Sequence, residues 1–385
     1  MKAIELDVSQ QARPEGVRRT MRLRNVGPSS AGEIEIYFDL LGDQEAPFPE
    51  LLDGFVIGVI LLAMANGRPL RVHGALSATV CRNLAEFQSA WAIWEPQRYR
   101  RIELIPDAVV DVSSVGQAQR AISAMSGGVD GVFTAVRHAR KWLGNGSYPL
   151  TDAVLIHGFD VTLEQAEAYV RLADRVRPLV ERLGLRLRLM RTNLKPITGQ
   201  HWEHSHGTAI AACLHNYSHS HSTALIGGGV SYAQLVYPWG STPATDYLLS
   251  GDQMRLVLDG SGFSRTEKVA ALRDEPGALS KLKVCWQGSQ PERNCGHCEK
   301  CVRTKLNLLA ARVERCEAFD EPLDLKDVER LRPTNEFQYI EMSSLCEYAQ
   351  KHGVTEEWVG ILKRRVSRYE RRKLLGAILA AVRRR

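Results

Sequence analysis

Apolar and polar positions in the first part of the chain predict a small α/β layer. Residues 33–38, Glu-Ile-Glu-Ile-Tyr-Phe, alternate as in a strand with one buried face. The apolar run Leu51–Asn66 has the length of a buried helix, and Gly67-Arg68-Pro69 ends it. Shorter apolar runs predict two strands with a helix between them, at Leu70–His73, Leu84–Trp94 and Arg101–Ile105. We interpret residues 1–115 as an N-terminal α/β extension, with the polar stretch Asp107–Gln117 at its boundary.

Strand-like and helix-like segments alternate farther along. A strand-like run leads to Ser126, and three more cover Ala153–Ile156, Leu185–Thr192 and Thr223–Ile226. Leu163–Leu183 has the period of a helix, and His206-Gly207-Thr208 is predicted to open another.

Residues 126–131, Ser-Gly-Gly-Val-Asp-Gly, lie where the first of these strands meets a helix-period pattern. Such a corner offers free backbone N–H groups and the positive end of a helix dipole to an anion. Gly127 and Gly128 allow the backbone to approach a phosphate closely. The residue order is not that of a P-loop, and no Lys follows it. The alternative is a glycine turn that binds no ligand.

Four cysteines with the spacing C-x9-C-x2-C-x2-C predict a closed, structural zinc site, namely Cys285, Cys295, Cys298 and Cys301. Asn294 and Gly296 permit a tight turn, and three cations could offset the thiolate charge: Arg293, Lys300 and Arg303. The alternatives are disulfides and a sulfur-relay Cys-x-x-Cys. Disulfides are disfavoured because the other cysteines are scattered and no signal-peptide pattern precedes them.

Composition predicts a cytoplasmic protein with no membrane association. The chain has 385 residues, of which 44% are hydrophobic. Its longest apolar run, Phe55–Met64, is too short to span a bilayer. The formal net charge of +6 is concentrated toward the end of residues 316–385, which we expect to form a basic helical region. That helix suits a solvated face, nucleic acid, or a protein partner, including a second copy of the chain.

Histidines gather within about twenty residues, at His201, His204, His206, His215, His219 and His221. His215 and His219 have the i, i+4 spacing of a metal pair, but no carboxylate lies between them as in a zinc protease. We expect these histidines to face solvent or substrate, with a second metal site as the alternative. Trp202, His206 and Arg191 are placed near the carboxyl edge of the sheet, where ligands bind. A separate aromatic group, comprising Trp91, Trp94 and Tyr99, suits a core better than a base-stacking surface.

The loop and the cysteines together resemble a known family. Residues 126–131 resemble the Ser-Gly-Gly-x-Asp-Ser pyrophosphate loop of N-type ATP pyrophosphatases. The stretch from about Arg120 to Leu309 is similar to the 7-cyano-7-deazaguanine synthase (QueC-like) enzymes. Other landmarks of that family come in the same order, at His157-Gly158-Phe159-Asp160, Gly227-Gly228-Gly229, Tyr237-Pro238 and Ser264–Lys268.

The resemblance implies an α/β fold over residues 116–315, with the parallel sheet of adenine nucleotide alpha hydrolase-like (HUP) domains and a zinc knuckle at 285–301. It implies that ATP and Mg²⁺ bind at Ser126, Gly127, Gly128, Val129, Asp130, Gly131, His157 and Asp160. Asp130 is the candidate Mg²⁺ ligand, and Lys268 or Arg265 would neutralise the leaving pyrophosphate. A carboxylate of the 7-deazaguanine type, or a related small acid, would attack the α-phosphate, and ammonia or an amine would then displace AMP.

The chain also departs from the family. Gly131 replaces the second loop serine, with Thr134 one turn farther on as a partial substitute. His206-Gly207 stands in place of Arg-Asn, and Trp-Gly-Ser-Thr-Pro after Tyr237-Pro238 replaces Asp-Cys-Arg. These changes indicate a divergent QueC-like enzyme. Two alternatives remain open: a tRNA-modifying adenylating enzyme, and a non-catalytic ATP-binding scaffold.

Overall fold

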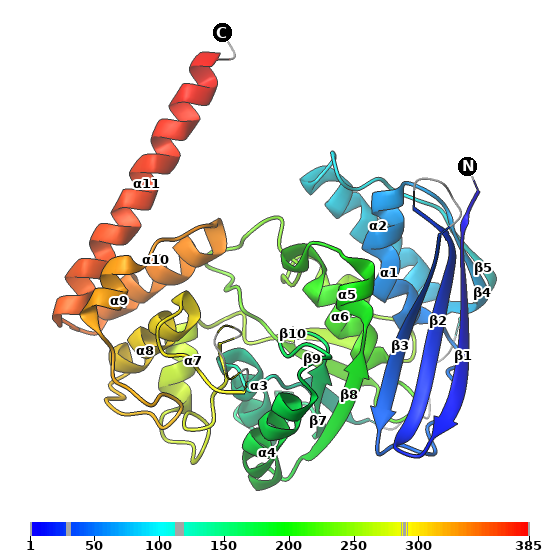
Figure 1. Ribbon diagram of the computed structural model, residues 1–385, viewed down its shortest axis with the longest axis horizontal. Helices are drawn as coiled ribbons and strands as arrows, with labels where there is room; N and C mark the ends of the chain where they lie inside the picture. The colour runs from blue at the N-terminus through cyan, green and yellow to red at the C-terminus, as the bar shows by residue number, and fades with distance from the viewer. Residues whose placement is uncertain are drawn as a thin grey trace.

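The computed structural model describes residues 2–27, 32–111, 119–285, 287, 290 and 292–383, with side chains as far as residue 375. A single ten-stranded mixed sheet forms its frame (Figure 1). Helices cover one half of this sheet on both faces and the other half on one face. A separate group of helices near the C-terminus packs beside it.

Five parallel strands form one half of the sheet. They are β6 (Ala121–Ala124), β7 (Leu150–His157), β8 (Arg186–Thr192), β9 (Thr223–Gly227) and β10 (Arg255–Asp259). Their spatial order is β10-β9-β6-β7-β8, and all neighbours are parallel. The chain thus runs outward from β6 to β8 and returns on the other side of β6. Ligands of open α/β sheets bind at the carboxyl ends of the strands where the order reverses, which here lies between β6 and β9.

Helices cover both faces of these parallel strands. One face carries α3 (Val129–Ala139), α4 (Ala166–Arg182) and α7 (Arg265–Leu272), and the other carries α5 (Leu194–Thr198) and α6 (Trp202–His215). Successive strand residues point to opposite faces, so Ala121 belongs to the core under α3 and α4, whereas Ile122 belongs to the core under α6. Two short 3-10 turns, Gly144–Gly146 and Asp246–Leu249, lie in the connections.

The N-terminal half extends the same sheet. It consists of β1 (Ile4–Arg13), β2 (Gly16–Val26), β3 (Gly32–Leu41), α1 (Asp53–Asn66), β4 (Leu70–Ser77), α2 (Ala78–Trp94) and β5 (Leu104–Val110). Strand β3 pairs antiparallel with β8, with Phe38 opposite Thr192, so the two halves share a continuous ladder. Helix α1 is buried against α6. The expected boundary falls mostly on residues 112–118, which lie outside the described residues.

Strands β1 and β2 are additional to the predicted elements. Their outer face is charged: Arg22 lies 2.6 Å from Glu35 and Arg24 lies 3.0 Å from Asp7. Because only alternate residues are apolar, no continuous apolar run marks these strands. Trp91 and Tyr99 are 0% and 1% exposed, so the aromatic group of α2 belongs to the core as expected.

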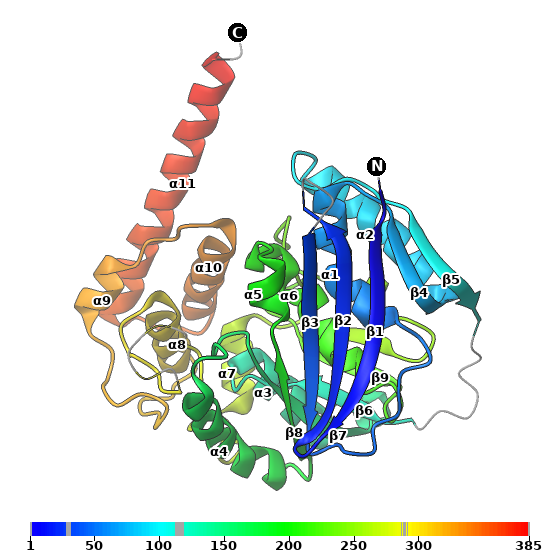
Figure 2. The ribbon, with the colours of Figure 1, turned by 45° about the vertical axis from the view of Figure 1, so that its right-hand side comes forward.

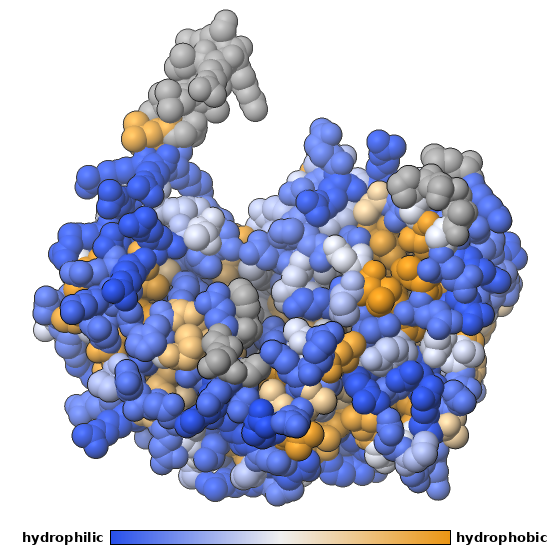
Figure 3. Space-filling view, viewed as in Figure 1, coloured by the Kyte–Doolittle hydropathy of each residue, from blue (hydrophilic) through white to orange (hydrophobic). Residues whose placement is uncertain are grey.

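The C-terminal helices form a third core. They are α8 (Glu299–Ala310), α9 (Leu325–Arg330), α10 (Glu336–Lys351) and α11 (Glu357–Arg383). Trp358 and Leu362 of α11 are buried in this core, and beyond them the helix projects away from the body (Figures 1 and 2). The surface is largely hydrophilic and is notched between the base of α11 and the lobe that carries α2 (Figure 3). Within the described parts of the chain, no helix combines the length and hydrophobicity needed to cross a membrane.

Candidate functional site

The loop after β6 lies at the point where the strand order reverses. Gly127 has φ +80°, a backbone conformation that side chains disfavour, and Gly128 precedes the first residue of α3. The Ser126 hydroxyl accepts a 3.3 Å hydrogen bond from the Gly128 N–H. Val129 is buried in the core beneath the loop, so only its backbone can serve a ligand. The loop therefore presents the N-terminus of an eleven-residue helix at the sheet edge.

The carboxylate of Asp130 is held by two cations on the β9 side of the loop. Its oxygens lie 2.7 Å from the Arg265 guanidinium and 2.8 Å from the Lys268 ammonium. Lys268 is 1% exposed and also donates to the Gly228 carbonyl. Burial alone would raise the pKa of Asp130, but the charges of Arg265 and Lys268 outweigh it and lower the pKa. The three residues predicted to act together are thus in direct contact.

Helix α7 begins in a way that delivers both cations to this site. Ser264 caps the helix by accepting from the Glu267 N–H, and the Glu267 side chain accepts from the Ser264 N–H. This capping box fixes the first turn, from which Arg265 and Lys268 project three residues apart on one face. The predicted helix start at Ser264–Lys268 is confirmed.

Gly227 closes the β9 side of the site by close backbone approach. A β-carbon at this position would lie 2.5 Å from the Asp130 carbonyl carbon and oxygen and 2.8 Å from the Gly131 nitrogen. The end of β9 and the first turn of α3 therefore touch through backbone alone. Only glycine fits here without moving the helix.

We expect Gly227→Ala to lower the stability of the protein by roughly 1–3 kcal/mol, because its methyl group would push against the backbone of α3. The displaced helix should also lose affinity for pyrophosphate. Gly262→Ala is the matched control, since a β-carbon there meets nothing within 4 Å. Urea unfolding and calorimetry with pyrophosphate measure the two effects. Equal stability of both variants would contradict the close contact.

Gly131 and Thr134 face away from the open side of the loop. A β-carbon at Gly131 would lie 3.1 Å from the Ala124 carbonyl oxygen, so a serine there would be crowded against β6. Thr134 is fully buried and donates a 2.9 Å hydrogen bond to Asp259. Thr134 therefore does not replace the missing loop hydroxyl.

The C-terminal helices contribute residues that the sequence did not single out. Glu341 of α10 lies 2.9 Å from Arg265 and also pairs with Arg303 of α8. Arg303 in turn lies 2.6 Å from Glu299. Burial alone would lower the pKa of Arg303, but its carboxylate partners raise it above the ordinary value, so Arg303 stays charged. A chain of alternating charges thus connects Asp130 to α8 and α10.

On the β7 side of the loop, the two predicted ligands separate. His157 is buried, donates a 2.8 Å hydrogen bond to the Thr162 carbonyl and stacks on Tyr169 at 4.4 Å. Burial lowers its pKa, so the ring is neutral near pH 7 and supports the fold. Asp160 is exposed, and its charge acts on Lys195, Lys283 and Lys300. Only Asp160 of this pair is open to a ligand.

The four cysteines converge as predicted. Their sulfur atoms all lie within 4.8 Å of one another, with Cys285 3.6 Å from Cys298 and Cys295 3.9 Å from Cys301. Tetrahedral zinc with bonds of about 2.3 Å requires sulfur separations of about 3.8 Å, which these distances match. Backbone N–H groups of Cys298 and Gln287 donate to two of the sulfurs. Among the described residues, this is the only group of metal-ligating side chains so close together.

The cysteine segment is fastened to the loop. The Lys283 N–H donates a 2.8 Å hydrogen bond to the Gly127 carbonyl. The Asn294 side chain accepts from the Val284 and Cys285 N–H groups and donates to the Leu282 carbonyl. Gly296 has φ +84°, as the predicted tight turn needs. The knuckle thus borders the candidate anion site directly.

The three predicted charge partners of the thiolates differ in position. Arg293 pairs with Asp320 at 3.0 Å, and both side chains are at least half exposed. Arg303 is engaged by Glu299 and Glu341. Burial lowers the pKa of Lys300, and its nearest charged influence is Asp160.

No protein-family model, curated protein or solved structure matches this chain.

The histidine-rich segment contains α6, which begins at Trp202 and not at His206 as predicted. The helix starts earlier because the polar residues of 202–205 form its first turn, before the apolar pattern becomes regular. The His206 ring nitrogen Nδ1 lies 3.0 Å from the Trp202 carbonyl, and burial lowers its pKa to about 4. The ring also meets Trp239 at 5.5 Å. Arg191 pairs with Asp39 at 2.8 Å and therefore faces β3, not the loop.

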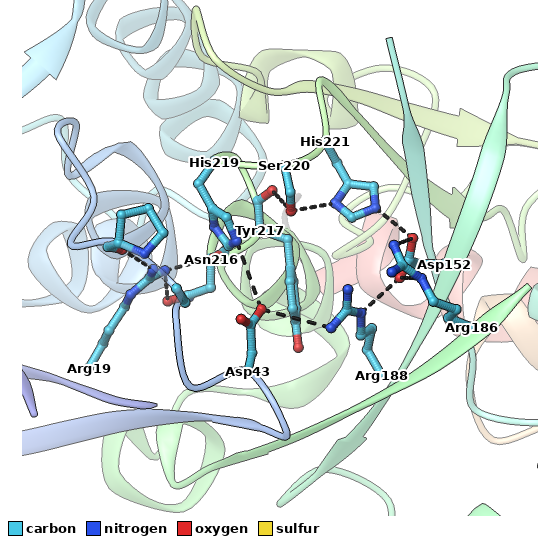
Figure 4. Close-up of polar contacts among 12 residues, drawn as sticks. Arg19, Asp43, Asp152, Arg186, Arg188, Asn216, Tyr217, His219, Ser220 and His221 are labelled. Atoms are coloured by element: carbon cyan, nitrogen blue, oxygen red, sulfur yellow. Dashed lines mark hydrogen bonds and ion pairs between the residues drawn. The ribbon is translucent and has the colours of Figure 1, made fainter. Parts of the chain in front are cut away.

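His215, His219 and His221 do not converge on a metal. His215 lies 2.9 Å from the Leu249 carbonyl, and His219 approaches Asp43 at 3.8 Å. The His221 ring lies between Ser220, at 3.0 Å, and the buried carboxylate of Asp152, at 2.9 Å (Figure 4). These contacts are at the amino end of β7, opposite the loop. They assign the histidines to the fold.

Asp152 is the centre of this buried network. It accepts hydrogen bonds from Thr151 at 2.6 Å, Arg188 at 2.8 Å and Arg186 at 3.1 Å, in addition to the contact with His221. Burial alone would raise the pKa of Asp152, but these hydrogen bonds outweigh it and lower the pKa strongly. The carboxylate thus joins β7 to β8 and to the segment after α6.

We expect Asp152→Asn to destabilise the protein by about 3 kcal/mol at pH 7, because two arginines lose their buried partner. A lowered pKa in the folded state gives stability above the unfolded-state pKa of about 3.9, and that stability is lost as the pH falls. The difference between wild type and variant should therefore narrow below about pH 4. Asp274→Asn is the control, since Asp274 is 85% exposed. A constant difference between pH 7 and pH 3 in urea unfolding would contradict the assignment.

Proposed function

We propose that this protein activates a carboxylic acid with ATP, releasing pyrophosphate, and then transfers the acyl group from AMP to ammonia or an amine. The observation that carries the proposal is the contact of Asp130 with Arg265 and Lys268 beside the loop at the switch point. It is supported by the order of the parallel strands, which numbered along the chain is 3-2-1-4-5. That order suits a HUP-type domain of the QueC-like kind.

In this proposal the loop binds the β- and γ-phosphates of ATP. The N–H groups of Gly127, Gly128 and Asp130 donate to the phosphate oxygens, together with the Ser126 hydroxyl. Arg265 and Lys268 neutralise charge on the leaving pyrophosphate as its bond to the α-phosphorus breaks. Mg²⁺, when bound near Asp130, would screen the phosphate charges.

The acid would occupy the side of the site nearest α6. Three partly buried rings from two segments line this side: Trp202, His206 and Trp239. The Lys195 ammonium lies 4.4 Å from the centre of the Trp202 ring. Aromatic faces with one nearby cation suit a planar aromatic acid. This supports an acid of the 7-deazaguanine type, whose carboxylate oxygen would attack the α-phosphorus.

The test is acid-dependent exchange of labelled pyrophosphate into ATP, with 7-carboxy-7-deazaguanine and related planar acids. We expect exchange without any amine, and AMP plus pyrophosphate when ammonia or an amine is added. Release of ADP and phosphate would overturn the proposal. Exchange that requires tRNA would favour the tRNA-modifying alternative. ATP binding without exchange for any planar acid would favour the scaffold alternative suggested by Gly131.

A further inference from the structure

The cysteine knuckle brings two lysines to the loop, one from each side of the cluster. Lys283 lies two residues before Cys285, and Lys300 lies between Cys298 and Cys301. Lys283 is 8% exposed, and its backbone is fixed to Gly127 by the 2.8 Å hydrogen bond. A β-carbon on Gly127 would lie 3.3 Å from the Lys283 β-carbon. Lys283 is therefore packed directly against the turn of the loop.

The charges around these lysines are unbalanced. The charge of Asp160 acts on Lys283, on Lys300 and on Lys195, so three ammonium groups share the influence of one exposed carboxylate. Lys283 and Lys300 also repel each other. A buried excess of positive charge costs free energy unless an anion accompanies it. The described arrangement thus favours an oxyanion in the space beside Asp160.

The position of this charge determines which oxyanion fits. Arg265 and Lys268 lie on the β9 side of the loop, whereas Asp160 follows β7 on the opposite side. A triphosphate whose β- and γ-phosphates rest on the loop, next to Arg265 and Lys268, extends its α-phosphate toward the β7 side. We infer that Lys283 and Lys300 form a subsite for the α-phosphate of the nucleotide. This inference rests on the proposed function.

The competing explanation is that both lysines only offset the charge of the cysteine thiolates. The charges of Cys285 and Cys301 do act on Lys283. For Lys300, however, Asp160 is the leading charged influence, with Arg265 and Arg303 next. Arg265 belongs to the Asp130 cluster, so Lys300 connects the knuckle with the phosphate side of the site. The two explanations differ in whether removal of a lysine affects the metal or the nucleotide.

Calorimetry with two ligands tests the inference. Pyrophosphate with Mg²⁺ probes the loop and the β9 side alone. The α,β-methylene analogue of ATP with Mg²⁺ adds the α-phosphate and cannot release pyrophosphate. Lys283→Met and Lys300→Met are each compared with Lys281→Met, a matched control from the same segment whose backbone carbonyl, not its ammonium, makes the described hydrogen bond. Zinc content and melting temperature are recorded for every variant.

We expect each variant to bind the ATP analogue about tenfold more weakly, as loss of one charge-assisted contact predicts, and to bind pyrophosphate within about threefold of wild type. Zinc content should stay unchanged. Lys283→Arg, which keeps the charge, should retain most of the affinity, and Lys300→Met gives a separate test if Lys283→Met does not fold. Unchanged affinity for the analogue, equal loss for both ligands, or loss of zinc would overturn the inference. If wild type binds neither ligand, the proposed function itself fails.

Discussion

Asp130→Asn should reduce AMP formation by about 10²–10³-fold, the largest effect expected of any single substitution at the loop. The asparagine keeps the size of the side chain but removes the charge that fixes Arg265 and Lys268 at 2.7 and 2.8 Å. Both cations would then lack the partner that directs them toward the phosphates. Labelled-ATP turnover with the accepted acid, followed by separation of AMP, measures the loss.

Asp174→Asn provides the matched control, because Asp174 is an exposed carboxylate on α4. Urea unfolding of Asp130→Asn shows how much of the lost activity is lost folding, since removal of one partner from a buried ion pair costs about 3–5 kcal/mol. The assay is therefore made at a temperature where the variant is folded. Wild-type turnover by a folded Asp130→Asn variant would exclude a catalytic role for this carboxylate.

Loss of the cysteine cluster should have the largest effect on stability. We expect one zinc ion per chain, and we expect Cys301→Ser to remove it, because Cys301 is fully buried and supplies one of the four sulfurs. Structural zinc contributes on the order of 10 kcal/mol of apparent binding free energy in small modules. The knuckle would unfold first, and the hydrogen bond from Lys283 to Gly127 would be lost with it. Elemental analysis and thermal unfolding report the two steps.

Cys81→Ser serves as the control for this substitution, since Cys81 lies on α2, outside the cluster. It should keep both the metal and the melting temperature. A Cys301→Ser protein that stays folded and active without metal would contradict the structural role. That outcome would favour a sulfur-relay function for Cys298 and its neighbours, where a hydrogen bond from Cys301 lowers the pKa of Cys298 to about 5.

The parts of the site that the sequence predicted are those encoded by short, local patterns. The loop at 126–131, the capping box at Ser264 and the cysteine spacing each depend on residues within one turn or one knuckle. Apolar runs likewise predicted α1 and the central strands, because burial on both faces leaves a continuous pattern.

The parts that the sequence did not predict depend on long-range contacts. Glu341 reaches Arg265 from a helix more than seventy residues away, and Lys283 meets Gly127 across a similar distance along the chain. No local spacing encodes such pairs. His206 was placed at a helix start because the resemblance suggested it, whereas the helix begins at Trp202. Strands β1 and β2 escaped prediction because their charged outer face interrupts the apolar pattern.

The ladder between β3 and β8 has a consequence for how this chain can be divided. Residues 38–41 protect the outer edge of the parallel strands, and α1 covers the apolar side of α6. A fragment that starts at the loop would present a bare strand edge and an uncovered greasy helix, both of which invite aggregation. The first hundred residues are thus an architectural necessity and not a detachable accessory. Any evolutionary or engineered exchange of specificity has to keep them together with the loop.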